Sequence, residues 1–218
     1  MIRNETEARA YVAGLVNDPV IMDQLDLFTA RLGEENGRQN LVAAASLPHV
    51  WCRHIADSAQ LLAHVPRETA GPWLDLGSGA GFPGLIIAIL QSGQEITLVE
   101  SRRKRIDWLE RIVGELGLAA CRIEGRRLEQ VETAPVAVIS ARAFAPLAAT
   151  YRLSTRFSTE RTMYLLPKGR SAAQELHDMP DWIRQTFHVE QSLTDPDAGI
   201  VVGRLNKEAQ AMIRRGKL

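Results

Sequence analysis

The chain has 218 residues, and its 26 Lys and Arg balance 26 Asp and Glu, so its formal net charge is zero. This balance does not indicate a globally basic nucleic-acid-binding protein, and any contact with nucleic acid must come from local patches. Cys52 and Cys121 have no pairing or metal-binding spacing, the charged N-terminus has no signal-peptide core, and the apolar runs are too short to span a bilayer. We therefore expect a cytoplasmic globular protein without disulfides or metal.

Residues 1–66 are predicted to form an N-terminal helical extension. Apolar side chains recur at helical spacing over residues 5–33, and Asn-Asp-Pro at 17–19 divides this stretch. Proline is favoured in the first turn of a helix, so the second helix is predicted to begin at Pro19.

A polar loop is predicted over residues 33–40, followed by a helix from about Leu47 to His64. Ser46 is the expected N-cap of that helix, because a serine side chain can accept from a free backbone N–H of the first turn. Residues 65–72 are expected to link the extension to the second part of the chain.

Strands alternate with helices over residues 67–208, which predicts one α/β domain with a mostly parallel seven-stranded sheet and helices on both faces. Two further strands around the T-D-P-D-A-G turn are expected to form an antiparallel C-terminal hairpin, and residues 209–218 a polar tail that frays. The predicted strands are Trp73–Leu76, Glu95–Glu100, Ala119–Glu124, Val136–Ser140, Thr162–Leu166, Phe187–Leu193 and Gly199–Leu205. The predicted helices are Pro83–Gln91, Arg102–Leu116, Pro146–Phe157 and Ser171–His177.

The first of these strands runs into a glycine loop, W-L-D-L-G-S-G-A-G-F-P-G at 73–84. A strand, a glycine turn and a helix place a ligand at the carboxyl end of the sheet. Gly79-x-Gly81-x-x-Gly84 satisfies the dinucleotide-binding pattern, but the pattern is short. A pyrophosphate site, a phosphate-free nucleoside site and a turn that only packs are all compatible with these glycines.

Two residues of the loop disfavour phosphate. The carboxylate of Asp75 would repel a pyrophosphate, and Pro83 has no N–H to offer one. S-adenosylmethionine has a sulfonium and an amino group and no phosphate, so it loses little from either feature. Glu100 ends the next strand, where a carboxylate can accept hydrogen bonds from both ribose hydroxyls; NAD carries this ribose too, so Glu100 does not discriminate.

The combination of motifs resembles the bacterial small-subunit rRNA guanine-N7 methyltransferases, the glucose-inhibited division protein B family of Rossmann-like class I methyltransferases. The match covers about residues 36–170 and rests on D-L-G-S-G-A-G-F-P-G with N-L (40–41), R-H-I-A-D-S (53–58), S-R-R-K-R-I-D-W-L (101–109), R-L-E (127–129), S-A-R-A-F (140–144) and P-K-G (167–169). The resemblance implies methyl transfer from S-adenosylmethionine to N7 of one guanine of 16S rRNA, guanine 527 in the usual rRNA numbering. The product cofactor would be S-adenosylhomocysteine, and the expected partner is 16S rRNA, free or in the small ribosomal subunit, bound by a monomer.

The resemblance also assigns residues to the cofactor site. These are Gly77 and Phe82 in the loop, Leu128 and Glu129 near the adenine, and Arg142 at the edge that faces the substrate. With the anchors argued above, the predicted cofactor-binding set is Asp75, Gly77, Gly79, Gly81, Phe82, Glu100, Leu128, Glu129 and Arg142.

The chemistry of guanine N7 agrees with the residues present. No N-P-P-Y or D-P-P-Y follows the fourth strand, and neither cysteine has the context of a nucleophilic thiol. N7 carries a lone pair and no proton, so in-line transfer needs alignment rather than a general base. Arg142 and Lys168 follow strands at the ligand end of the sheet and are the predicted catalytic residues, as donors to guanine O6 or a phosphate.

Other interpretations stay open at this point. Arg53 and Asp57, like His54 and Ser58, stand four residues apart, so they fit a helix-surface pair as well as a functional role. His54 has no second ligand at metal-binding spacing. The alternative functions are a NAD-dependent oxidoreductase and a non-catalytic RNA-binding module on a methyltransferase scaffold.

Overall fold

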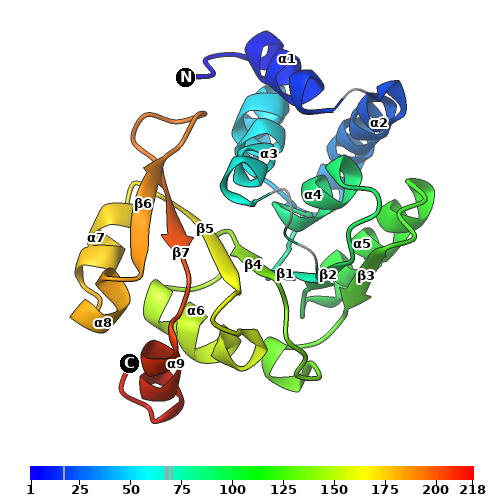
Figure 1. Cartoon of the computed structure of the whole chain (residues 1–218). Coiled ribbons are helices and arrows are strands. Elements are labelled where there is room, and N and C mark those ends of the chain that lie inside the picture. Colours follow the sequence, from blue (N-terminus) through cyan, green and yellow to red (C-terminus); the bar gives the residue numbers. More distant parts are fainter. Residues whose placement is uncertain (17, 67–68, 70) are drawn as a thin grey trace.

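The computed structural model describes residues 1–16, 18–66, 69 and 71–218. Residue 17, in the predicted break between two helices, lies outside this range. Residues 67, 68 and 70 of the predicted linker also lie outside it, so the predicted domain boundary between residues 66 and 67 is described on one side. The described residues form a central sheet with helices on both faces (Figure 1).

The sheet has seven strands in the order β3-β2-β1-β4-β5-β7-β6. The first five strands pair in parallel, and β7 pairs antiparallel with both β5 and β6. This arrangement confirms the predicted α/β fold with its C-terminal hairpin. The strands are β1 (Trp73–Leu76), β2 (Ile96–Val99), β3 (Cys121–Glu124), β4 (Val138–Ala141), β5 (Met163–Gly169), β6 (Phe187–Gln191) and β7 (Gly199–Gly203).

Two groups of helices bury opposite faces of the sheet (Figure 1). Successive residues of a strand point to opposite faces, so Trp73 of β1 joins one core cluster and Leu74 the other. The first face carries α1 (Glu5–Leu15), α2 (Pro19–Asn36), α3 (Asp57–Ala59), α4 (Gly84–Leu90) and α5 (Arg103–Glu115). The second face carries α6 (Leu147–Ser154), α7 (Ala172–His177), α8 (Asp181–Arg184) and α9 (Lys207–Arg214).

The N-terminal extension differs in part from its prediction. Pro19 does begin α2, but α2 continues to Asn36, so the polar loop starts later than residue 33. The predicted helix at 47–64 is a series of short turns: η1 (Ala44–His49), a π-helical turn η2 (Trp51–Ala56), α3 and η3 (Gln60–His64). Ser46 is not an N-cap, because it lies inside η1 and its hydroxyl donates to the carbonyl of Ala43.

The predicted fraying tail is wrong, because residues 207–214 form α9. Asn206 caps this helix by accepting from the N–H of Ala209, and Ala209 and Ile213 are buried against the second core cluster. The tail reads as polar because its apolar residues are few, but their helical spacing gives one buried face.

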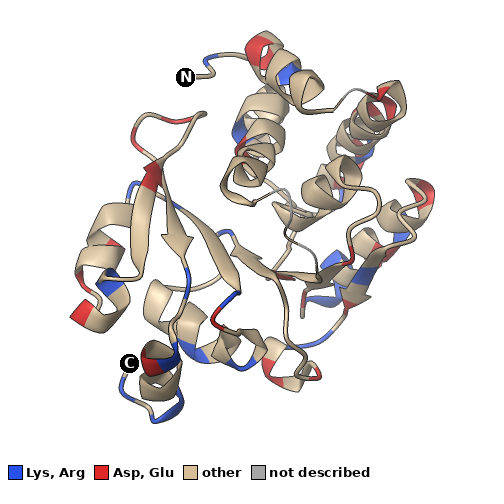
Figure 2. Cartoon of the chain, viewed as in Figure 1, with Lys and Arg blue, Asp and Glu red and all other residues tan. Residues whose placement is uncertain are grey.

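Charged residues lie mostly on the helices and loops around the sheet, and basic residues gather near β3 and near the C-terminus (Figure 2). Within the described ranges, no helix combines the length and the apolar character needed to cross a membrane.

Candidate functional site: two adjoining cavities at the carboxyl end of the sheet

The candidate site lies where the strand order reverses. β1 pairs with β2 on one side and with β4 on the other, so the turns that follow β1 and β4 open a crevice between them. The turn after β1 is the glycine loop, and the turn after β4 carries Arg142 and Phe144. Residues far apart in the chain thus meet at one edge of the sheet.

Gly77 begins the glycine loop in a conformation that requires glycine. Its φ is +65°, and a Cβ at this position would lie 2.7 Å from Cδ2 of Phe144. The loop is fixed to the sheet by the N–H of Ser78, which donates to the carbonyl of Val99 over 3.0 Å. The backbone at Gly77 therefore packs against the Phe144 ring and also lines the cavity described below.

Asp75 lies beneath the glycine loop and is fully buried. Its Oδ1 accepts from the Ser140 hydroxyl over 2.5 Å, and that hydroxyl accepts from the Trp73 indole N–H over 2.8 Å. Its Oδ2 has no hydrogen-bond partner among the described residues, and burial raises the pKa of this carboxyl group. Asp75 lines neither cavity described below, so these contacts position β1 against β4, and its predicted contact with the cofactor stays a prediction.

Glu100 joins the glycine loop to the start of α5. It accepts from the N–H of Gly79 over 3.0 Å through Oε2, and from the N–H groups of Ser101 and Arg102 over 2.7 and 2.8 Å through Oε1. Glu100 is 6% exposed and still borders the cavity beside the loop. A carboxylate has about four acceptor sites, so Glu100 keeps capacity for a further donor such as a ribose hydroxyl.

The glycine-loop cavity has a volume of about 460 Å³. It combines two acidic residues, four arginines and several apolar side chains, a lining that suits a nucleoside. The lining residues are Gly77, Val99, Glu100, Ser101, Arg102, Arg105, Arg126, Arg127, Leu128, Glu129, Ala143, Phe144, Ala145 and Leu153. Four of the predicted cofactor residues are therefore together here.

The hairpin cavity adjoins the first and has a volume of about 520 Å³. It lies between the turn after β4, the end of β5 and the loop that joins β6 to β7. Its lining residues are Arg53, Asp57, Arg142, Ala143, Phe144, Ala145, Pro146, Pro167, Lys168, Gly169, Ser171, Glu175, Ser192, Thr194, Asp195, Ala198, Gly199 and Ile200. Ala143, Phe144 and Ala145 line both cavities and form the boundary between them.

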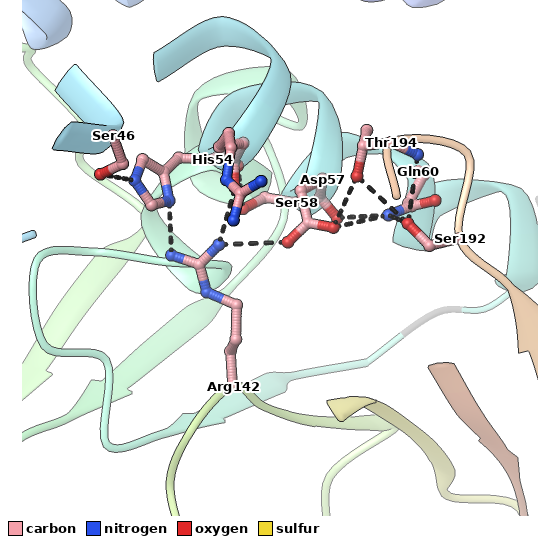
Figure 3. Close-up of polar contacts among 9 residues, drawn as sticks. Ser46, His54, Asp57, Ser58, Gln60, Arg142, Ser192 and Thr194 are labelled. Atoms are coloured by element: carbon pink, nitrogen blue, oxygen red, sulfur yellow. Dashed lines mark hydrogen bonds and ion pairs between the residues drawn. The ribbon is translucent and has the colours of Figure 1, made fainter. Parts of the chain in front are cut away.

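Arg142 extends from the end of β4 to the N-terminal extension (Figure 3). Its Nη1 donates to Oδ2 of Asp57 over 3.1 Å and to the carbonyl of Arg53 over 3.3 Å. The other oxygen of Asp57 accepts from the hydroxyl of Thr194 in the hairpin loop over 3.0 Å. Asp57 thus ties three parts of the chain together around the hairpin cavity, and Arg142 borders that cavity rather than the glycine-loop cavity.

His54 completes this polar network as a neutral side chain. Burial, together with the charges of Arg142 and Arg53, lowers its pKa from 6.5 to about 3. Its Nδ1 lies 3.2 Å from Nη2 of Arg142, which can only donate, so Nδ1 accepts and Nε2 donates to the Ser46 hydroxyl at 2.8 Å. The imidazole also stacks on Phe82, with ring centroids 4.8 Å apart.

Lys168 borders the hairpin cavity but its ammonium group has protein partners. Nζ donates to the carbonyl of Ala145 over 2.5 Å and lies 3.0 Å from Oε2 of Glu175. The same Glu175 oxygen accepts from the N–H of Leu147 over 3.0 Å. Lys168 and Glu175 therefore hold residues 145–147 in place, and a direct catalytic role for Lys168 stays a prediction.

Besides Asp75, three of the predicted cofactor residues border neither cavity. Phe82 is 4% exposed and packs against Phe28 and His54. Gly81 leaves room for Leu85, whose Cδ2 would lie 2.8 Å from an added Cβ, and Gly79 faces Arg105. These residues shape the loop from behind.

Sequence reasoning missed Arg105 and Phe144 as site residues. An added Cβ at Gly79 would lie 3.3 Å from Nη1 of Arg105, and Arg105 lines the glycine-loop cavity. The sequence did not single out Arg105 within the basic run 102–105, because helical spacing suggests a solvated face and does not show which arginine turns inward.

Across the described residues, no group of three or more His, Cys, Asp or Glu side chains is arranged to hold a metal ion.

Comparisons with known proteins agree with this geometry. Residues 21–195 match a family model described as rRNA small subunit methyltransferase G, GidB. The chain is 56% identical over 204 residues to ribosomal RNA small subunit methyltransferase G of Erythrobacter litoralis, covering 94% of this chain and 98% of the relative. It is 54% identical to the protein of that name from Novosphingobium aromaticivorans, covering 92% of this chain and 88% of the relative.

Solved structures show the same fold at low sequence identity. The structure of M. jannaschii TYW2 in complex with AdoMet matches with a TM-score of 0.51 and 11% identity, over 69% of this chain and 76% of that one. At this identity the likeness concerns the arrangement of the sheet and its helices.

Proposed function

Because the chain belongs to the rRNA small subunit methyltransferase G (GidB) family, we propose that it methylates N7 of a specific guanine in 16S rRNA. The methyl donor is S-adenosylmethionine, which supplies an electrophilic methyl group on its sulfonium. The observation that carries the proposal is the pair of adjoining cavities, one suited to a nucleoside cofactor and one open to a base.

The residues of the glycine-loop cavity fit the cofactor. Glu100 has acceptor capacity left for a ribose hydroxyl, and Leu128 gives an apolar surface for the adenine with Glu129 beside it. Gly77 lines this cavity, and its missing side chain makes room for the Phe144 ring beside the methionine part. Asp75 and the other loop glycines support this cavity from behind.

Methylation of guanine N7 requires the protein to align the base with the methyl donor. Guanine N7 attacks with a lone pair that carries no proton, so the protein must hold it in line with the methyl group. Arg142 borders the hairpin cavity with a guanidinium that can donate to guanine O6 or to a neighbouring phosphate. Lys168 fixes Ala145, which is part of the same wall.

We place the reaction in the cytoplasm because the substrate is rRNA, we take the RNA alone or within the small ribosomal subunit as the partner, and we expect a monomer. The N-terminal extension, residues 1–66, covers one side of the site through Asp57 and His54, and residues 67–208 carry the cofactor.

Methyl transfer to rRNA from cells that lack this protein tests the proposal. Tritium from labelled S-adenosylmethionine should enter 16S rRNA, and mass spectrometry of the digested RNA should find one 7-methylguanosine. Label at another atom would contradict N7 as the acceptor. Binding of NAD without S-adenosylmethionine would favour an oxidoreductase, and RNA binding without transfer would favour a non-catalytic module.

A further inference from the structure

Phe144 occupies a singular place in the site. Among the described residues that line the two cavities, it is the only aromatic one, and it lines both of them. Its ring is half-buried, with one part packed against the second core cluster and the rest facing the crevice. A phenylalanine that served only the core would be expected to withdraw from the cavities, as Phe157 and Phe187 do.

The backbone around Phe144 is held on both sides. On one side Arg142 is tied to Asp57, and on the other the carbonyl of Ala145 accepts from Lys168. Between these anchors Ala143 adopts a φ of +52°, a left-handed conformation that is uncommon for a residue with a side chain. Such strain persists when the surrounding contacts determine it, and here it presents the Phe144 ring over Gly77.

The ring therefore stands at the boundary that a methyl group must cross. During transfer the N7–C bond forms as the S–C bond breaks, and the positive charge moves from sulfur to the purine ring. Enzymes that modify a base stack it on aromatic or apolar side chains, and an aromatic face also attracts a positively charged ring. Arg142 can supply the hydrogen bond at the edge of the base, but its guanidinium already lies over the ring of Phe82, 4.8 Å from the centroid.

We propose that Phe144 is the substrate-binding residue on which the acceptor guanine stacks while N7 meets the methyl group. This inference rests on the proposed function and deepens it. It also accounts for the two anchors, because a stacking surface must be rigid to align N7 with the methyl group.

Phe144→Leu and Phe144→Tyr test the proposal as a matched pair. Leucine keeps an apolar side chain but removes the aromatic face, whereas tyrosine keeps the face. We expect the leucine variant to lose about tenfold or more in kcat/KM for rRNA, as base stacking predicts, and the tyrosine variant to stay within about threefold of wild type. The Kd for S-adenosylmethionine should change by less than about threefold in both.

Four outcomes would overturn this role. Wild-type kcat/KM in the leucine variant, or an equal loss in the tyrosine variant, would exclude stacking while leaving the proposed function intact. A parallel loss of cofactor affinity would assign Phe144 to the cofactor instead. Absence of methyl transfer by the wild-type protein would remove the proposed function and this inference together. If the leucine variant does not fold, Phe144→Met, with its flexible apolar side chain, replaces it in the same comparison.

Discussion

Nη1 of Arg142 lies 3.1 Å from Oδ2 of Asp57, and this ion pair joins residues 85 positions apart in the sequence. Both side chains are about one-fifth exposed, so the pair is shielded from much of the solvent. The contact sets the direction of Arg142 at the wall of the hairpin cavity. Because Asp57 also accepts from Thr194, the N-terminal extension and the hairpin loop share one anchor with Arg142.

Arg142→Ala should therefore impair methylation of the RNA more than binding of the cofactor. We expect kcat/KM for rRNA to fall about 10- to 100-fold, the range for loss of an arginine contact to guanine, with little change in the Kd for S-adenosylmethionine. Arg170→Ala is the control, because the Arg170 side chain is 79% exposed and its one ion-pair partner among the described residues is the exposed Asp197. Unchanged methyl transfer in the Arg142 variant would contradict the role given to this residue.

His54 should make the stability of the fold depend on pH. Its pKa is lowered from 6.5 in the unfolded chain to about 3 in the fold, so its contribution to stability is present above pH 6.5 and is lost as the pH falls toward 3. Between pH 7.5 and pH 5 this contribution should decline by about 2 kcal/mol at most.

His54→Gln removes this titration and keeps a polar side chain. Thermal unfolding of both proteins at pH 7.5 and pH 5 measures the effect, and the fall in Tm on acidification should be smaller for the variant. An equal fall in both proteins would show that His54 is not held neutral by its surroundings.

Gly77→Ala should weaken cofactor binding through a steric clash with Phe144 as well as through backbone strain. The added Cβ would lie 2.7 Å from Cδ2 of Phe144, at a φ of +65°. Gly117→Ala is a matched control, because Gly117 has a φ of +66° and nothing within 4 Å of an added Cβ. Both variants should lose about 1 kcal/mol of stability or more. Calorimetric titration should show reduced affinity for S-adenosylmethionine only in the Gly77 variant, and equal affinities would argue against this loop as the cofactor site.

Glu100→Gln should reduce affinity for S-adenosylmethionine by about tenfold or more, the effect of losing one charged hydrogen bond. The substituted amide keeps the shape of the side chain, but it offers one acceptor oxygen in place of two. It also removes the negative charge of the carboxylate, which accepts hydrogen bonds from three backbone N–H groups. Glu95→Gln is the control, since Glu95 is exposed and lies at the other end of β2. Equal affinities of the Glu100 variant and wild type would remove Glu100 from the cofactor site.

Local patterns in the sequence determined most of the secondary structure. Alternation of strands and helices predicted the sheet, and all seven strands begin within two residues of their predicted starts. The glycine loop, Glu100 at the end of its strand and Pro19 at the start of α2 were also readable. Each depends on residues within a few positions of one another, whose backbone preferences act locally.

Tertiary packing decided which atoms of these residues face a ligand. The sequence identified Asp75 as an acidic neighbour of the loop, but only the pairing of β1 with β4 brings Ser140, 65 residues away, against its carboxylate. The same holds for Arg142 with Asp57, and for Phe144 at the boundary of two cavities. A periodic pattern predicts that a side chain is buried, but it does not predict which residues that side chain contacts. Those partners come from distant elements, whose positions follow from the packing of the whole core.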